Sequence, residues 1–184
     1  VIFDGNITDG SSGDGGAIEF MTGSTSVINS TIFRNNKAGS AASYQIGMNG
    51  GATKGNGSCT VTFNNCLFHE NVARGYSGAH TNWMNDGGSS TFNNCTIEGN
   101  IQYDTNNYGA VSALYGTVNM RNSIIRNTID GSAGAGTARD IYYVTGVNLN
   151  YGVQASSSLS GTNSTNDPLF TDAANDDYSL QSGS

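Results

Sequence analysis

One nine-residue phrase occurs four times in this chain, at residues 28–36, 63–71, 92–100 and 120–128, and it constrains the fold more than any other feature. Each copy reads large apolar, any residue, Asn or Ser, small, any residue, Phe or Ile, any two residues, and finally Asn or Thr. Self-similarity at a fixed period is typical of a solenoid, whose repeats bury their apolar side only by stacking on neighbours. The repeat therefore predicts a stack of coils.

A second phrase, centred on Gly-Ala, precedes every copy, at residues 15–18, 50–53, 77–80 and 108–111. The final positions of the first phrase lie 35 residues apart from Asn36 to Asn71, 29 from Asn71 to Asn100, and 28 from Asn100 to Thr128. About thirty residues per coil suffice for three short strands and three turns. Apolar residues alternate, as in 59–63, which indicates strands, and Gly and Asn at the bends suit a left-handed backbone.

Equivalent residues of successive coils should form parallel ladders. One interior stack is expected to contain Ile28, Phe63, Phe92 and Met120, and a second to contain Phe33, Phe68, Ile97 and Ile125. Asn36, Asn71 and Asn100 are expected to form an asparagine ladder at a turn, each amide bonding the next coil. These roles are structural.

The predicted fold is all-β, a right-handed parallel β-helix of about five to six coils in a single segment of residues 1–184. Residues 1–14 read as a partial N-terminal coil, 15–128 as four clear repeats, and 129–184 as irregular C-terminal coils. Because the chain begins in mid-coil, we expect it to belong to a longer chain.

The composition limits the classes of partner that this chain is expected to bind. The net charge of -7 disfavours nucleic acid and anionic membrane surfaces, which need basic patches. No apolar run approaches the roughly 20 residues of a spanning helix. Cys66 and Cys95 share the repeat position of Thr31 and Ser123, which predicts buried free thiols rather than a disulfide framework, and Cys59 has no counterpart.

The Gly-Gly-Ala-Ile of residues 15–18, with Phe33-x-x-Asn36 and Phe68-x-x-Asn71, is similar to the paired motifs of chlamydial polymorphic outer-membrane proteins. The later copies depart, since Ile97 and Ile125 replace the Phe. The stretch from Asp140 to Ser184 resembles the last coils of secreted Bacteroidetes β-helix proteins that carry a C-terminal anchoring region. The resemblance implies a secreted or cell-surface bacterial protein and carries over no catalytic residue.

The function expected first is therefore non-catalytic: an extracellular scaffold or adhesin-type stalk that contacts a polysaccharide or a protein partner. The alternative is a β-helix polysaccharide lyase or glycoside hydrolase, which needs a base with a charge neutraliser, or paired carboxylates. His69, Glu98 and Arg126 fall at one outward repeat position, as does Arg34. They are the catalytic candidates, and a ladder of surface ion pairs is the structural alternative.

Two kinds of ligand site are also expected. Exposed aromatic rings on one rim could stack on sugar rings, or could fill coil corners; these are Tyr76, Trp83, Tyr103 and Tyr108. His80 and Trp83 are placed in an insertion between coils. The acidic turn at Asp172, Asp176 and Asp177 is a calcium candidate, and no other cofactor is expected.

A stripe of outward apolar residues, Ile32, Leu67 and Ile124, predicts a face covered by another domain, a protomer or a folded-back loop. Thr96 interrupts the stripe. An ice-binding face would need a repeated Thr-x-Thr ladder, and only Thr60-Val-Thr62 qualifies, so that function is set aside.

Overall fold

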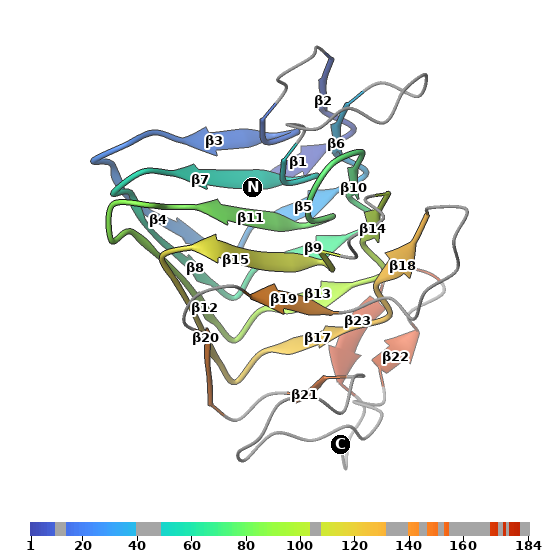
Figure 1. The fold of residues 1–184 in the computed structure, drawn as a ribbon. Coiled ribbons are helices and arrows are strands. Elements are labelled where there is room, and N and C mark those ends of the chain that lie inside the picture. Colours follow the sequence, from blue (N-terminus) through green and yellow to red (C-terminus); the bar gives the residue numbers. More distant parts are fainter. Residues whose placement is uncertain are drawn as a thin grey trace.

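The computed structural model describes residues 1–9, 14–39, 49–103, 108–131, 140–143, 147–150, 153–154, 170–172, 175 and 177–180. Within this part of the chain all regular elements are β-strands, and they wind into the stacked coils of Figure 1. The strands stack in parallel, coil upon coil, which confirms the right-handed parallel β-helix that the repeat predicts. No helix among the described residues is long and apolar enough to cross a membrane.

Each coil contributes one strand to each of four parallel sheets, named here A to D. Sheet A contains β1 (Ile2–Asp4), β5 (Ile32–Arg34), β9 (Leu67–His69), β13 (Thr96–Glu98), β17 (Ile124–Arg126) and β21 (Val153–Gln154). Sheet B contains β2 (Ile7–Thr8), β6 (Lys37–Ala38), β10 (Val72–Ala73), β14 (Ile101–Gln102) and β18 (Ile129–Asp130).

Sheet C contains β3 (Ile18–Phe20), β7 (Thr53–Asn56), β11 (His80–Trp83), β15 (Val111–Tyr115) and β19 (Ile141–Tyr143). Sheet D contains β4 (Thr25–Asn29), β8 (Thr60–Asn64), β12 (Ser89–Asn93), β16 (Thr117–Arg121) and β20 (Val147–Asn150). The chain runs through the sheets in the order C, D, A, B. A separate antiparallel hairpin joins β22 (Phe170–Asp172) to β23 (Asp177–Leu180), so the end of the chain does not simply add another coil.

Four strands per coil correct the expectation of three. The extra strand arises because sheets D and A meet at a corner of only two residues, the first of which has a left-handed backbone. The corner residues are Ser30, Asn65, Asn94 and Asn122, with φ between 46° and 53°. The corner between sheets A and B works in the same way, with Gly5, Asn35, Glu70, Gly99 and Asn127. Asn and Gly tolerate this conformation best, which explains why they recur there.

The interior consists of the predicted ladders. Phe63 pairs in register with Ile28 and Phe92, and Phe68 pairs with Phe33 and Ile97. Rings stack along a ladder, as in Phe33–Phe68 with centroids 4.7 Å apart, and meet edge to face between ladders, as in Phe63–Phe68 at 5.2 Å. Both geometries are favoured for aromatic pairs.

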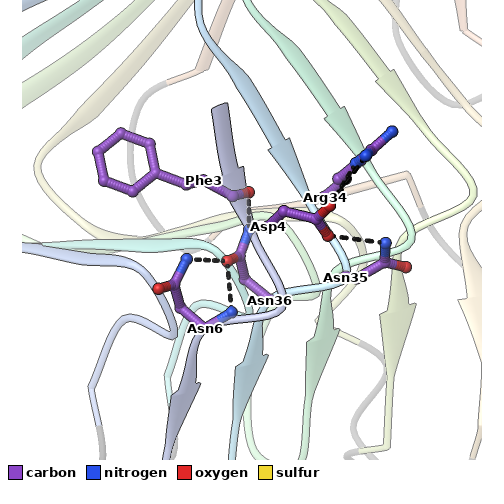
Figure 2. Close-up of polar contacts among 6 residues, drawn as sticks. All are labelled: Phe3, Asp4, Asn6, Arg34, Asn35 and Asn36. Carbon is purple, nitrogen blue, oxygen red and sulfur yellow. Dashed lines mark hydrogen bonds and ion pairs between the residues drawn. The ribbon is translucent and has the colours of Figure 1, made fainter. Parts of the chain in front are cut away.

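The predicted asparagine ladder is present and buried. The Nδ2 atom of Asn36 donates to Oδ1 of Asn71 at 2.9 Å, and Nδ2 of Asn71 donates to Oδ1 of Asn100 at the same distance. Each side chain also bonds a backbone carbonyl of the preceding coil, as Asn71 does with Phe33. Figure 2 shows the N-terminal end of the ladder, where Asn6 donates to Asn36.

Candidate functional site

An aromatic cluster lies on the outer side of sheet C. The rings of Tyr76 and Tyr108 meet edge to face with centroids 4.5 Å apart, and Trp83 lies 5.6 Å from Tyr76. Tyr115 extends the cluster, with its ring 5.3 Å from Trp83. Tyr115 is 42% exposed, and the other three rings are half-buried. The structure thus brings together three of the four predicted aromatic residues and adds a fourth.

The fourth predicted residue, Tyr103, lies apart from this cluster. Its ring stacks on the guanidinium group of Arg74, whose Cζ atom is 3.9 Å from the ring centroid. Tyr103 therefore packs against Arg74, after strand β14 of sheet B, rather than against the cluster. The expectation that all four predicted rings lie together on one rim is corrected.

A buried ion pair lies next to the cluster. Lys54 in β7 pairs with Asp14, and its ammonium group lies 5.9 Å from the centroid of the Trp83 ring. Asn49 donates from Nδ2 to Asp14 Oδ1 at 2.9 Å. Lys54 is almost fully buried, and its ammonium group lies within the range of a cation–π contact with Trp83 at the edge of the cluster.

Sequence reasoning missed Tyr115, because a β-bulge moves this residue out of the repeat spacing. Asn56 and Trp83 both lie four residues after the Ala of the Gly-Ala phrase, and they pair in register. Tyr115 lies five residues after Ala110 because a β-bulge shifts the pairing between Asn82 and Trp83. A fixed offset along the repeat therefore misses Tyr115.

His80 occupies the interior rather than an insertion, which corrects its predicted place. It starts β11 in the inward column of Ile18, Thr53 and Val111. Its Nδ1 atom lies 2.8 Å from the Thr53 hydroxyl, and its Nε2 atom lies 2.7 Å from Oδ1 of Asn82. Since Nδ2 of Asn82 donates to the carbonyl of Thr117, its Oδ1 accepts, which places the imidazole proton on Nε2.

Burial lowers the pKa of His80 to about 4, and the hydrogen bond that its imidazole donates to Asn82 opposes this shift. His80 is therefore neutral at pH 7. The network is fully buried, and the rings of Phe63 and Phe92 lie 5.6 Å and 5.5 Å from the imidazole. It is a structural feature of the core.

The three catalytic candidates form a column on sheet A. Glu98 pairs in register with His69 on one side and with Arg126 on the other. Arg126 Nε lies 3.6 Å from Glu98 Oε2, and Nδ2 of Asn127 donates to Glu98 Oε1 at 2.6 Å. At the other end of the column, Arg34 pairs with Asp4 at 2.9 Å, as Figure 2 shows. The Asn35 and Arg34 side chains lower the pKa of the Asp4 carboxyl.

His69 is buried under the C-terminal hairpin. Its ring lies 5.4 Å from that of Tyr178 in β23, and Tyr178 in turn meets Phe170 of β22. The column thus consists of ion pairs and one covered imidazole. Glu98 pairs with Arg126, as the structural alternative expects, but Glu98 and His69 are buried rather than at the solvated surface, and the catalytic role of the three residues stays a prediction.

The apolar stripe lies beside this column. Ile32, Leu67 and Ile124 are half-buried, and they alternate along β5, β9 and β17 with the buried inward residues. Tyr178 reaches over part of the stripe and borders a groove of about 360 Å³. The groove is lined by Ser30, Thr31, Ile32, Asn65, Cys66, Leu67, Asn94, Thr96 and Tyr178. A segment of the chain itself therefore covers part of the predicted interface.

The calcium candidates lie in the hairpin. Asp172 and Asp177 face each other across the two strands and are exposed, and Nδ2 of Asn175 donates to Asp172 at 2.8 Å. Asp176 lies outside the described residues. In the described part of the chain, no three His, Cys, Asp or Glu side chains gather closely enough to hold a metal ion.

All three cysteines are buried free thiols. Cys66 and Cys95 stack on adjacent coils, and each Sγ lies 3.4 Å from the carbonyl two residues before it. Burial raises the pKa of the Cys59 thiol. The small repeat position thus has the structural role that its sequence predicts.

Comparisons with protein-family models, with curated proteins and with solved structures gave no match. The fold and the surface therefore define the class of protein: a parallel β-helix repeat protein with an aromatic cluster on the outer face of sheet C.

Proposed function

We propose that this chain is the non-catalytic β-helix scaffold of a secreted or surface-attached bacterial protein, and that it contacts carbohydrate. The aromatic cluster of Tyr76, Trp83, Tyr108 and Tyr115 carries the proposal. A sugar ring has an apolar C–H face and a polar rim. Tyr and Trp match it because each combines a flat apolar body with one polar group.

The position of the cluster supports this function. The four rings contact one another, and Lys54 lies over Trp83, so few rotamers would be lost on binding. The rings are also partly exposed, in contrast to the fully buried phenylalanines of the core. The secreted or surface location rests on the resemblance of the repeat phrases, as does a stalk-like or adhesin role.

The test is a glycan array followed by calorimetric titration, run with and without Ca²⁺. We expect Trp83→Ala and Tyr115→Ala to weaken binding at least about tenfold, or ~1.4 kcal/mol, since each removes a stacking surface. Tyr103→Ala is the matched control, because it removes the same kind of ring from outside the cluster. Equal loss in all three variants would contradict the assignment.

Product release from acidic polysaccharides should be followed in the same samples. Turnover would favour the lyase or hydrolase and would direct attention to His69, Glu98 and Arg126. A Glu98→Gln variant would then separate the possibilities, since its ion pair with Arg126 is lost whether or not Glu98 reacts, but only a catalytic Glu98 would abolish product release.

A further inference from the structure

The outer face of sheet D is a regular array of neutral hydrogen-bonding groups. Three columns run across the coils in unbroken register from β4 to β16. The first column contains Thr25, Thr60, Ser89 and Thr117; the second contains Val27, Thr62, Thr91 and Asn119; the third contains Asn29, Asn64, Asn93 and Arg121. Thr62 and Thr91 occupy the centre of this array.

These side chains face solvent. Each alternates along its strand with an inward residue of the core, such as Phe63 or Phe92, and all are exposed or half-buried. Ten of the twelve are hydroxyl or amide side chains, and Val27 and Arg121 are the exceptions at the edges. On a chain of net charge -7, a face of this size without a carboxylate is a distinct surface.

The array is held in place by its own hydrogen bonds. Nδ2 of Asn93 donates to Oδ1 of Asn64 at 2.9 Å, and Nδ2 of Asn64 donates to Oδ1 of Asn29 at 2.9 Å. Farther along, Asn148 donates to Asn119 at 2.9 Å. Amides fixed in this way lose little side-chain entropy when a ligand binds.

We propose that this face docks on the surface of an ordered, neutral polysaccharide. This inference rests on the proposed carbohydrate contact and names its substrate class. The groups repeat at roughly 4.8 Å across strands and roughly 6.6 Å along them. Each bond to a sugar hydroxyl contributes little net free energy, because it replaces a bond to water. Affinity therefore requires many simultaneous contacts with a partner that is itself regular, which favours an insoluble polysaccharide over a short oligosaccharide.

Other occupants fit the face less well. A protein interface has a core rich in aromatic and other large side chains, and here Val27, 60% exposed, is the large apolar member. An acidic polysaccharide would require several positive charges, and Arg121 is the one basic side chain among the twelve of this array. Ice would need one hydroxyl pattern repeated in every coil, whereas these three columns differ in chemistry.

The aromatic cluster adjoins the array. Tyr115 ends β15, and Thr117 of the first column begins β16 after the single residue Gly116, whose φ is 73°. Trp83 approaches the same corner from β11, ahead of Ser89. The corner thus joins a stacking surface on sheet C to a hydrogen-bonding surface on sheet D. A single sugar chain at the edge of a polysaccharide can therefore contact both surfaces.

The experiment measures sedimentation of the protein with microcrystalline cellulose and with chitin. Thr91→Asp places a charge at the centre of the array, and we expect it to lower the bound fraction at least fivefold. Thr171→Asp makes the same change on the exposed strand β22 of the hairpin and should leave sedimentation unchanged. Thr91→Lys repeats the test with the opposite charge, and thermal unfolding verifies that each variant is folded.

The outcomes separate this inference from the proposed function. Sedimentation lost in both Thr91 variants and largely retained in Trp83→Ala supports the docking face. Sedimentation that is equal in wild type and Thr91→Asp overturns it. Binding of soluble oligosaccharides without any sedimentation also overturns it and leaves the aromatic cluster as the contact. Inhibition of ice recrystallisation that Thr91→Asp abolishes, without polysaccharide binding, would assign the array to ice and overturn the polysaccharide.

Discussion

Two asparagine ladders run along this molecule, and they differ in almost everything except the residue. Asn36, Asn71 and Asn100 are buried at the corner between sheets A and B, where every amide bonds both a neighbouring amide and a backbone carbonyl. Asn29, Asn64 and Asn93 lie on the outer face of sheet D, where amides bond only each other. In the bonds between amides, the buried side chains donate to the next coil toward the C-terminus, and the exposed side chains donate to the coil before them.

The difference shows that environment, rather than residue type, decides what a polar ladder does. Within the coil, an unpaired amide would lack water as a substitute partner, so the buried ladder stabilises the corner. On the outer face, water replaces any lost bond, so the exposed ladder contributes little to folding and is available for a ligand.

The sharpest test of this contrast replaces one asparagine from each ladder. Asn71→Ala removes the amide that bonds Asn36, Asn100 and the carbonyl of Phe33, and leaves buried groups unpaired. We expect a loss of about 4 kcal/mol in the free energy of unfolding. Asn64→Ala should cost less than about 1 kcal/mol. Urea denaturation of both variants measures the difference, and similar losses would refute the contrast.

The second prediction concerns the buried His80 network. The pKa of His80 is about 4 in the folded protein and 6.5 for the free side chain, so the unfolded chain binds the extra proton between these values. Stability should therefore be fully present above pH 6.5 and fall as the pH drops toward 4, by about 3 kcal/mol from this group.

The control for this prediction is His80→Val, which copies Val111 of the same inward column. This variant should be less stable at pH 7 because Thr53 and Asn82 lose a partner, but its stability should depend less on pH between 6.5 and 4.5. Thermal or urea unfolding across that range gives both slopes. Equal slopes would mean that exposed carboxylates, rather than His80, set the acid sensitivity.

The smallest predicted effect concerns a corner residue. Glu70 has a φ of 52°, where two other coils have Asn and two have Gly. Glu70→Asn should raise stability by about 0.5–1 kcal/mol, since Asn adopts the left-handed backbone at lower cost. Glu70→Gln removes the same charge without that preference and should give no gain. If Gln stabilised as much as Asn, charge rather than backbone conformation would be the cause.

The repeat alone predicted the fold, the two interior stacks and the buried asparagine ladder, because a solenoid converts sequence period directly into spatial neighbours. The repeat does not predict features that leave the sequence period unchanged or that lie outside it. A two-residue corner such as Ser30-Thr31 interrupts a strand without interrupting the apolar alternation, so the fourth strand of each coil was not visible.

The site was less predictable for the same reason. Tyr115 is displaced by a bulge, Lys54 pairs with Asp14 from 40 residues away, and Tyr178 reaches His69 from a hairpin outside the repeat. None of these contacts follows from the period. They depend on where the irregular segments pack against the coils, and the secondary-structure propensity of a segment does not specify this position.

The lengths of the corners have a final consequence. Between sheets D and A, and between A and B, every described corner holds two residues. The connections from sheet B to sheet C are longer and unequal, spanning 9–17, 39–52, 74–79, 103–110 and 131–140. Tyr76 and Tyr108 come from these connections of unequal length. New sequence can therefore be inserted on this edge without altering the register of the rod. The surface beside the aromatic cluster is where such a scaffold can be re-engineered for new ligands while its frame is left unchanged.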